Sequence, residues 1–184
     1  IYIPPTMLIS GFGMVDDIAT CITMDAKTSG NLLVLIGETK RAMGGSHVLL
    51  VDSNAKCDNE LPWVSLTDGP RNAQNVFKVI KQGLITSAHD CSEGGILVAA
   101  AEMAFGGELG LDLQLQDESL CFSETPSRYL LEVHPDKLEQ IQQHFADIPC
   151  EVIGTFNDSD KMTLGSASWL LEDLCSGWMT GMVI

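Results

Sequence analysis

The chain has 184 residues, of which 45% are hydrophobic and 19% are charged, a composition typical of one folded globular domain rather than a disordered chain. Its net charge is −15, from 10 basic and 25 acidic side chains, so we expect neither a nucleic-acid surface nor docking on anionic lipid. A phosphate ligand would have to be held locally, by backbone N–H groups or a metal ion, because the overall field repels it.

The first half of the chain contains two predicted strands and one clear helix. Residues 7–15 follow a Pro-Pro pair and predict a strand, with glycines at bends or close approaches. Residues 32–39 form an apolar run too short for a helix, which predicts a buried strand. Residues 66–85 have helical apolar spacing, with Asp68 as the expected cap and Pro70 in the first turn.

The second half mixes strands and helices without strict alternation. A short strand is expected over 85–90, followed by a helix over 94–107 that is apolar nearly all round and therefore buried. The remaining predictions are strands over 110–116 and 127–133, a helix over 134–145, a hairpin of 150–156 with 161–165, and a closing helix over 166–178. These elements predict an α/β or α+β fold in which helices pack on a mixed β-sheet.

The stretch "SAHDCSEGG" (87–95) is the strongest candidate site. Gly94 and Gly95 open a helix, where unpaired N–H groups and the helix dipole favour a phosphate. Asp90 is suited to a divalent cation or a ribose hydroxyl. The alternative is structural: Asp90 or Ser92 caps the helix and the glycines permit close packing.

Two further stretches are weaker candidates. Glu38 directly follows a predicted buried strand, and the double glycine in 44–46 forms either an anion-binding turn or a surface loop. In "SETPSR", Glu124 and Arg128 either contact a ligand or pair with each other. The sequence contains no HExxH, GxSxG or GxxxxGK[ST] motif.

Cysteine usage bears on the compartment. No two cysteines form a CxxC pair, so we expect no structural zinc, and most lie beside apolar residues, as small core side chains do. An even number of cysteines would allow disulfides, but with no signal peptide and a chain that is not small we expect reduced thiols in a cytoplasmic protein. No apolar run is long enough to span a bilayer. The chain starts at Ile1 with "IYIPPT", which we interpret as the middle of a longer polypeptide.

Several motifs together resemble one enzyme family. "IPPTMLISGFGMVDDI", "LLVLIGETKRAMGGSH", "AHDCSEGG" with "AAAEMAF", and "LCFSETPSRYLLEV" occur in the order seen in phosphoribosylformylglycinamidine synthase. The resemblance runs to about residue 165. It implies a C-terminal domain like that of aminoimidazole ribonucleotide synthetase over 29–184, with 1–28 as a strand-rich lead-in from the preceding half-domain.

The same resemblance places the chain in the second of two pseudo-repeats. In the first repeat the segment equivalent to "SETPSR" reads Glu-Ser-Gln and contacts the substrate. Here Glu124 is kept, but Thr125 and Pro126 replace the other two residues, which favours the second repeat. The family's residues for ATP, magnesium and catalysis lie mostly in the N-terminal halves, so no catalytic or metal-ligating residue is assigned here.

The implied parent enzyme is an ATP-dependent carbon–nitrogen ligase of purine biosynthesis, which converts formylglycinamide ribonucleotide to the amidine with glutamine-derived ammonia. Its cofactors would be ATP and Mg²⁺, and its partners an N-terminal half-domain of the same polypeptide and a glutaminase. The isolated piece is expected to be inactive, with a possible homodimer. The expected ligand-binding residues are Asp90, Ser92, Gly94, Gly95 and Glu124. The alternatives are another superfamily member, such as aminoimidazole ribonucleotide synthetase, or a non-catalytic packing module.

Overall fold

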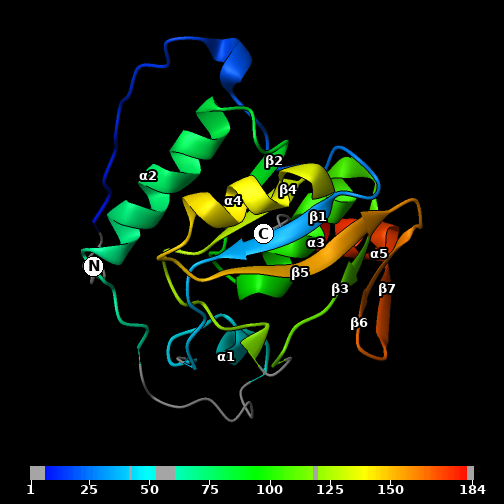
Figure 1. Ribbon diagram of the computed structural model, residues 1–184. Coiled ribbons are helices and arrows are strands. Elements are labelled where there is room, and N and C mark those ends of the chain that lie inside the picture. The colour runs from blue at the N-terminus through cyan, green and yellow to red at the C-terminus, as the bar shows by residue number, and fades with distance from the viewer. Residues whose placement is uncertain (1–6, 42, 53–60, 118–119, 182–184) are drawn as a thin grey trace.

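The computed structural model describes residues 7–41, 43–52, 61–117 and 120–181 (Figure 1). Its centre is a seven-stranded sheet with the strand order β2-β4-β1-β5-β3-β6-β7. The strands are β1 Leu32–Ile36, β2 Ser87–Asp90, β3 Gly110–Leu113, β4 Tyr129–Val133, β5 Cys150–Asn157, β6 Lys161–Leu164 and β7 Ala167–Leu170. The helices are α1 Val48–Val51, α2 Asp68–Lys81, α3 Gly95–Gly107, α4 Leu138–His144 and α5 Leu171–Gly181, with short 3-10 turns at η1 Ile18–Thr20 and η3 Pro135–Lys137.

The central strand β1 separates two hydrophobic cores. Side chains alternate across a strand, so Leu33 and Leu35 pack with α3 on one face of the sheet. Val34 and Ile36 pack on the other face, with apolar residues of α2 and α4. The sheet is therefore covered on both faces, with α2 and α4 on one side and α3 and α5 on the other (Figure 1). This arrangement confirms the predicted mixed sheet packed with helices.

Antiparallel pairing dominates the sheet. β1 is antiparallel to both β4 and β5, and β2 is antiparallel to β4. The parallel pair is β3 with β6, in the register Leu111 to Met162. Helices cover both faces of β1, which explains why Leu32–Ile36 is apolar throughout although its pairing is antiparallel.

The strand predicted over 7–15 is wrong. This segment has no regular structure, and it exposes large apolar side chains such as Leu8 and Phe12. In Figure 1 it is the blue segment that arches outside the body of the protein, beside α2. A strand needs a neighbour that pairs its backbone N–H and C=O groups, and the described chain offers none to this segment.

The hairpin predicted over 150–165 is also wrong. Strand β3 lies between β5 and β6, antiparallel to the first and parallel to the second. The hairpin partner of β6 is β7. The residues of β7 fall within the first part of the helix predicted over 166–178, so α5 begins only at Leu171. Gly165, with φ of 57°, makes the tight turn between these two strands.

The long helices agree with the sequence pattern. Pro70 lies in the first turn of α2, and α3 is buried along most of its length. Asp68 is not the cap of α2: it is the first helical residue and pairs with Arg71 at 2.9 Å, while its N–H donates to Ser65 Oγ. In the described ranges, no helix has the length and apolar character needed to cross a membrane.

Candidate functional site

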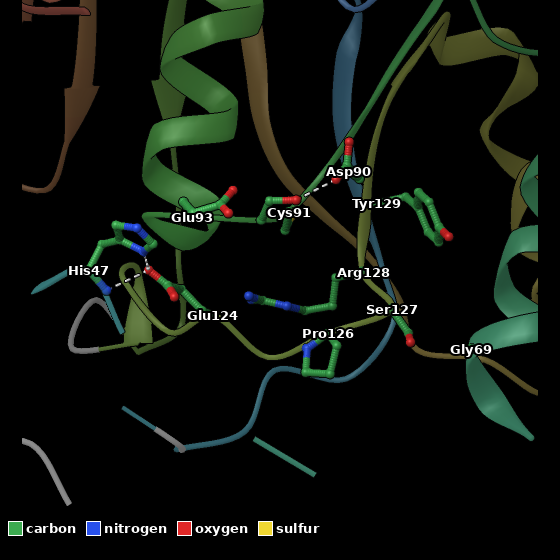
Figure 2. A pocket seen from close by; sticks show the side chains of 11 residues that line it. His47, Gly69, Asp90, Cys91, Glu93, Glu124, Pro126, Ser127, Arg128 and Tyr129 are labelled. Carbon is green, nitrogen blue, oxygen red and sulfur yellow. Dashed lines mark hydrogen bonds and ion pairs between the residues drawn. The ribbon is translucent and has the colours of Figure 1, made fainter. Parts of the chain in front are cut away.

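A polar pocket of about 470 Å³ lies where β2 ends and β4 begins (Figure 2). The two strands are antiparallel and pair Asp90 with Tyr129. The residues that follow Asp90 are therefore brought beside those that precede Tyr129, although they are far apart in sequence. We call this the main pocket; it is lined by His47, Gly69, Asp90, Cys91, Ser92, Glu93, Glu124, Pro126, Ser127, Arg128 and Tyr129.

The carboxylate of Glu124 is held in place at the main pocket by three contacts. Its Oε1 accepts hydrogen bonds from Gly94 N at 2.9 Å and His47 N at 2.8 Å, and His47 Nδ1 lies 3.1 Å away. Burial raises the pKa of Glu124, but the hydrogen bonds from these backbone and imidazole groups outweigh it, so the pKa lies below its ordinary value. Glu124 is therefore an anion fixed at the start of α3.

This contact changes the expectation for the glycine pair. Gly94 N–H donates to Glu124, and Gly95 N–H donates to Ser92 O at 3.1 Å, so these two amides are already bonded within the chain. Neither glycine lines the main pocket. The structure thus brings Asp90, Ser92 and Glu124 together there, with the two glycines behind them.

Close packing accounts for both glycines. Gly94 and Gly95 have φ values of 78° and 66°, a region that side chains disfavour. A Cβ on Gly95 would lie 2.4 Å from the carbonyl oxygen of Ser123, and one on Gly94 would meet Val98. Gly95 therefore lets the start of α3 approach the segment that carries Glu124, and Gly94 leaves room for Val98 of the same helix.

Like Glu93, Asp90 is an exposed acidic group of the main pocket. Its side chain is 64% exposed, and its Oδ2 accepts a hydrogen bond from Ser92 Oγ at 2.5 Å. Tyr129 lies opposite on β4, where burial and the charge of Asp90 raise the pKa of its phenol. Asp90, Ser92 and Tyr129 form a polar edge suited to hydroxyl groups or to a single cation contact.

Arg128 is a buried cation in the wall of the main pocket, with only 1% of its surface exposed. It does not pair with Glu124; it donates to Thr125 O at 2.8 Å, to Thr39 Oγ1 at 3.0 Å and to Ser123 O. Burial lowers the pKa of its guanidinium. Figure 2 shows the side chain pointing toward the side of the pocket where Glu124 lies.

The other sequence candidates lie outside the main pocket. Glu38 forms a surface ion pair with Lys40 at 3.1 Å. Ser46 bonds back to Met43 O at 2.7 Å, so the double-glycine loop is closed upon itself and leads into His47. Sequence reasoning did not select His47 or Tyr129, because their roles depend on contacts with distant segments.

The arrangement of metal-ligating side chains bears on whether the main pocket could hold Mg²⁺. Within the described ranges, no group of three or more His, Cys, Asp or Glu side chains is arranged to hold a metal ion. Asp90 and Glu93 are the exposed carboxylates of the main pocket, and one oxygen of Asp90 already bonds to Ser92. The described part of the chain therefore supplies no complete Mg²⁺ site.

Together these features define an α+β domain with a mixed sheet and a polar pocket at the junction of β2 and α3. Residues 28–166 match the family described as AIR synthase related protein, C-terminal domain, and the chain belongs to this family. The fold class expected from the sequence is thereby confirmed.

Similar proteins point to one kind of synthase. The chain is 35% identical over 159 residues to phosphoribosylformylglycinamidine synthase subunit PurL of Alkaliphilus metalliredigens, covering 83% of this chain and 21% of that protein. It is 34% identical over 156 residues to the same subunit of a Thermoanaerobacter species, covering 82% and 21%. The chain therefore spans about a fifth of the length of these curated relatives.

Solved structures support the fold. Thermotoga maritima PurL complexed with FGAR superposes with a TM-score of 0.73 at 16% identity, covering 85% of this chain and 30% of that one. Escherichia coli HypE, a hydrogenase maturation protein, matches with a TM-score of 0.55 at 14% identity, covering 82% and 52%. At these identities the likeness concerns the fold.

Proposed function

We propose that this chain is the C-terminal domain of the second pseudo-repeat of a phosphoribosylformylglycinamidine synthase, and that it is inactive alone. The observation that carries the proposal is the 35% identity over 159 residues to the PurL subunit, in the family's order of motifs. In the parent enzyme, ATP would phosphorylate the amide oxygen of formylglycinamide ribonucleotide, and ammonia would then displace the phosphate. Thermotoga maritima PurL has been crystallised with ATP and with ADP, which supports ATP as the cosubstrate.

The main pocket would form one wall of a ligand cleft that a neighbouring domain completes. Asp90, Ser92 and Glu124 remain our proposed ligand-binding residues, with Gly94 and Gly95 shaping the wall behind them. Glu124 acts by fixing His47 and the start of α3, so of these three residues Asp90 and Ser92 are the two exposed to a ligand. Mg²⁺, which neutralises phosphate charge in ATP-dependent enzymes, would require further ligands from the parent protein.

The partners follow from the same proposal. We divide the chain into a lead-in over 1–28 and the domain over 29–184, and we assign the lead-in to the preceding half-domain. The exposed apolar side chains of the described part of this lead-in would be covered by that half-domain. A glutaminase is the second proposed partner, in line with the solved PurLQS complex of Thermotoga maritima. A homodimer of the isolated piece is the alternative way to cover the same side chains.

A cytoplasmic location belongs to this proposal as well. Four of the described cysteines are free thiols, which suits a reducing compartment; they are Cys21, Cys91, Cys150 and Cys175.

The test uses the full polypeptide that contains this chain. We expect ADP release with formylglycinamide ribonucleotide and ammonia, and none with formylglycinamidine ribonucleotide, the substrate of aminoimidazole ribonucleotide synthetase. Turnover of the second substrate alone would favour the alternative synthetase, and turnover of neither would favour a packing module. Asp90→Ala in the same protein should weaken nucleotide or substrate binding, and unchanged affinity would remove the wall role.

A further inference from the structure

The turn that forms one wall of the main pocket is held in a disfavoured conformation. Ser127 has a φ of 66°, in the left-handed region that residues with side chains rarely adopt. Such a conformation persists only when surrounding contacts hold it. Ser127 lies between Pro126 and Arg128, which also line the main pocket, so a change at Ser127 would move this wall.

Asn72 of α2 supplies a contact that holds the turn. Its Nδ2 donates a hydrogen bond to Ser127 O at 2.9 Å, and only 4% of the residue's surface is exposed. Its Oδ1 is buried with no hydrogen-bond partner among the described residues. A buried acceptor without a donor is unfavourable. The hydrogen bond from Nδ2 to Ser127 O is therefore the contact through which the polar end of this side chain stabilises the fold.

Two glycines allow neighbouring segments to pack closely against the turn at Ser127. A Cβ on Gly37, which follows β1, would lie 2.8 Å from Ser127 O. A Cβ on Gly69, in the first turn of α2, would lie 2.9 Å from Ser127 Oγ. The end of β1 thus approaches the Ser127 backbone, and the start of α2 approaches its side chain, more closely than other residue types would permit.

The held turn continues into the floor of the main pocket. Arg128 O accepts a hydrogen bond from Cys91 N at 3.1 Å, next to the pairing of Asp90 with Tyr129. We propose that Asn72 is a positioning residue: by keeping Ser127 left-handed, it sets the wall from Pro126 to Arg128 against the strand end that carries Asp90. This inference rests on the proposed function only for the statement that the pocket binds a ligand.

The test measures backbone hydrogen exchange on the chain without ligand, so its outcome is independent of the proposed reaction. In Asn72→Ala, we expect the Cys91 amide to exchange about tenfold faster relative to Leu131, whose exchange reports on the central strand β4. Adding Ser127→Gly should return the ratio to within about twofold of the wild type, because glycine adopts a positive φ without strain. Asn75→Ala is the matched control, because Asn75 lies on the same helix, is only partly buried and bonds to Lys78 rather than to the turn; it should leave the ratio unchanged.

Three results would overturn the proposal. Equal acceleration at Cys91 and Leu131 would mean that Asn72 only stabilises the whole fold. The same effect from Asn75→Ala would mean that α2 acts through its helical stability. Failure of Ser127→Gly to restore protection would mean that the conformation of Ser127 is not what Asn72 controls.

Discussion

Glu124 accepts a hydrogen bond from the backbone N–H of Gly94 at 2.9 Å, which places a carboxylate of the chain itself at the start of helix α3. The N-terminal end of a helix attracts negative charge, through its unpaired N–H groups and its dipole. In this protein an internal side chain meets that demand and also binds the backbone of His47, 77 residues away in sequence. One carboxylate therefore joins three separate segments of the chain at the main pocket.

Removing this carboxylate should weaken the fold. We expect Glu124→Ala to lower the free energy of unfolding by about 1–3 kcal/mol, because the N–H groups of Gly94 and His47 lose their charged acceptor. Glu124→Gln keeps a neutral acceptor and should cost less. Urea unfolding measures both variants. Glu139→Ala on the exposed side of α4 is the control, with an expected change within about 0.5 kcal/mol.

The contribution of Glu124 should depend on pH in a defined direction. Its pKa in the folded protein lies below the ordinary value of 4.5, so its ionisation stabilises the folded state fully above that pH. The stabilisation is lost as the pH falls below 4.5 and through the lower folded pKa. The difference in unfolding free energy between wild type and Glu124→Gln should stay constant from neutral pH to about 4.5 and then shrink. A difference that grew on acidification would contradict this assignment.

The glycine pair offers a sharp steric test. Gly95→Ala should destabilise the protein by about 3 kcal/mol or more, because the new Cβ meets Ser123 O in a left-handed backbone. Gly177→Ala is the matched control: it lies in helix α5 with open space around it and should be neutral or stabilising by up to about 1 kcal/mol. Thermal unfolding of both variants would suffice, and equal melting temperatures would contradict the packing role of Gly95.

A second buried carboxylate ties the lead-in to the sheet. Glu132 on β4 is fully buried and accepts hydrogen bonds from Lys27 N, Thr28 N, Asn31 Nδ2 and Ser87 Oγ. Glu132→Gln would turn an amide NH₂ toward one of these donors, so we expect a loss of about 2–4 kcal/mol in urea unfolding. Glu172→Gln, exposed in the first turn of α5, is the control; a similar loss there would show a general charge effect.

The cysteines should differ in reactivity. Burial raises the pKa of Cys91 to about 12 and that of Cys150 to about 11, so both remain thiols at neutral pH. Cys21 is exposed and should be alkylated first. Mass spectrometry after brief treatment with iodoacetamide at pH 8 would rank them. Rapid labelling of Cys91 in the native protein would show that the floor of the main pocket opens.

The sequence predicted those elements that their own apolar spacing is enough to define. The apolar run before Gly37 and the helical spacing around Val76 each determine one element, because burial of the strand or helix face requires that periodicity. The pairing of β5 with β3 could not be found this way, since nothing in 150–165 distinguishes a hairpin from two strands separated by a third. Nor could Ala167–Leu170 be identified as a strand, because these residues suit a helix equally well.

The candidate site could likewise be predicted only in part from the sequence. The junction from Asp90 to Gly95 was recognisable, because a polar cluster before a glycine pair and an apolar run is a local signal. The partner of Gly94 was not, since Glu124 reaches it from another part of the chain. The Arg128 contacts with carbonyl groups likewise replace the ion pair that spacing alone had suggested as one alternative.

The strand order also constrains how the molecule acquires its structure. Among the described strands, β6 and β7 form the single pair of sheet neighbours that are consecutive in sequence. All other ladders join strands separated by intervening elements, so large loops must close before most backbone pairs can form. Refolding should therefore be slow for a chain of this length. The intermediates would expose unpaired strand edges, and dilute conditions or chaperones would favour recovery of the native domain.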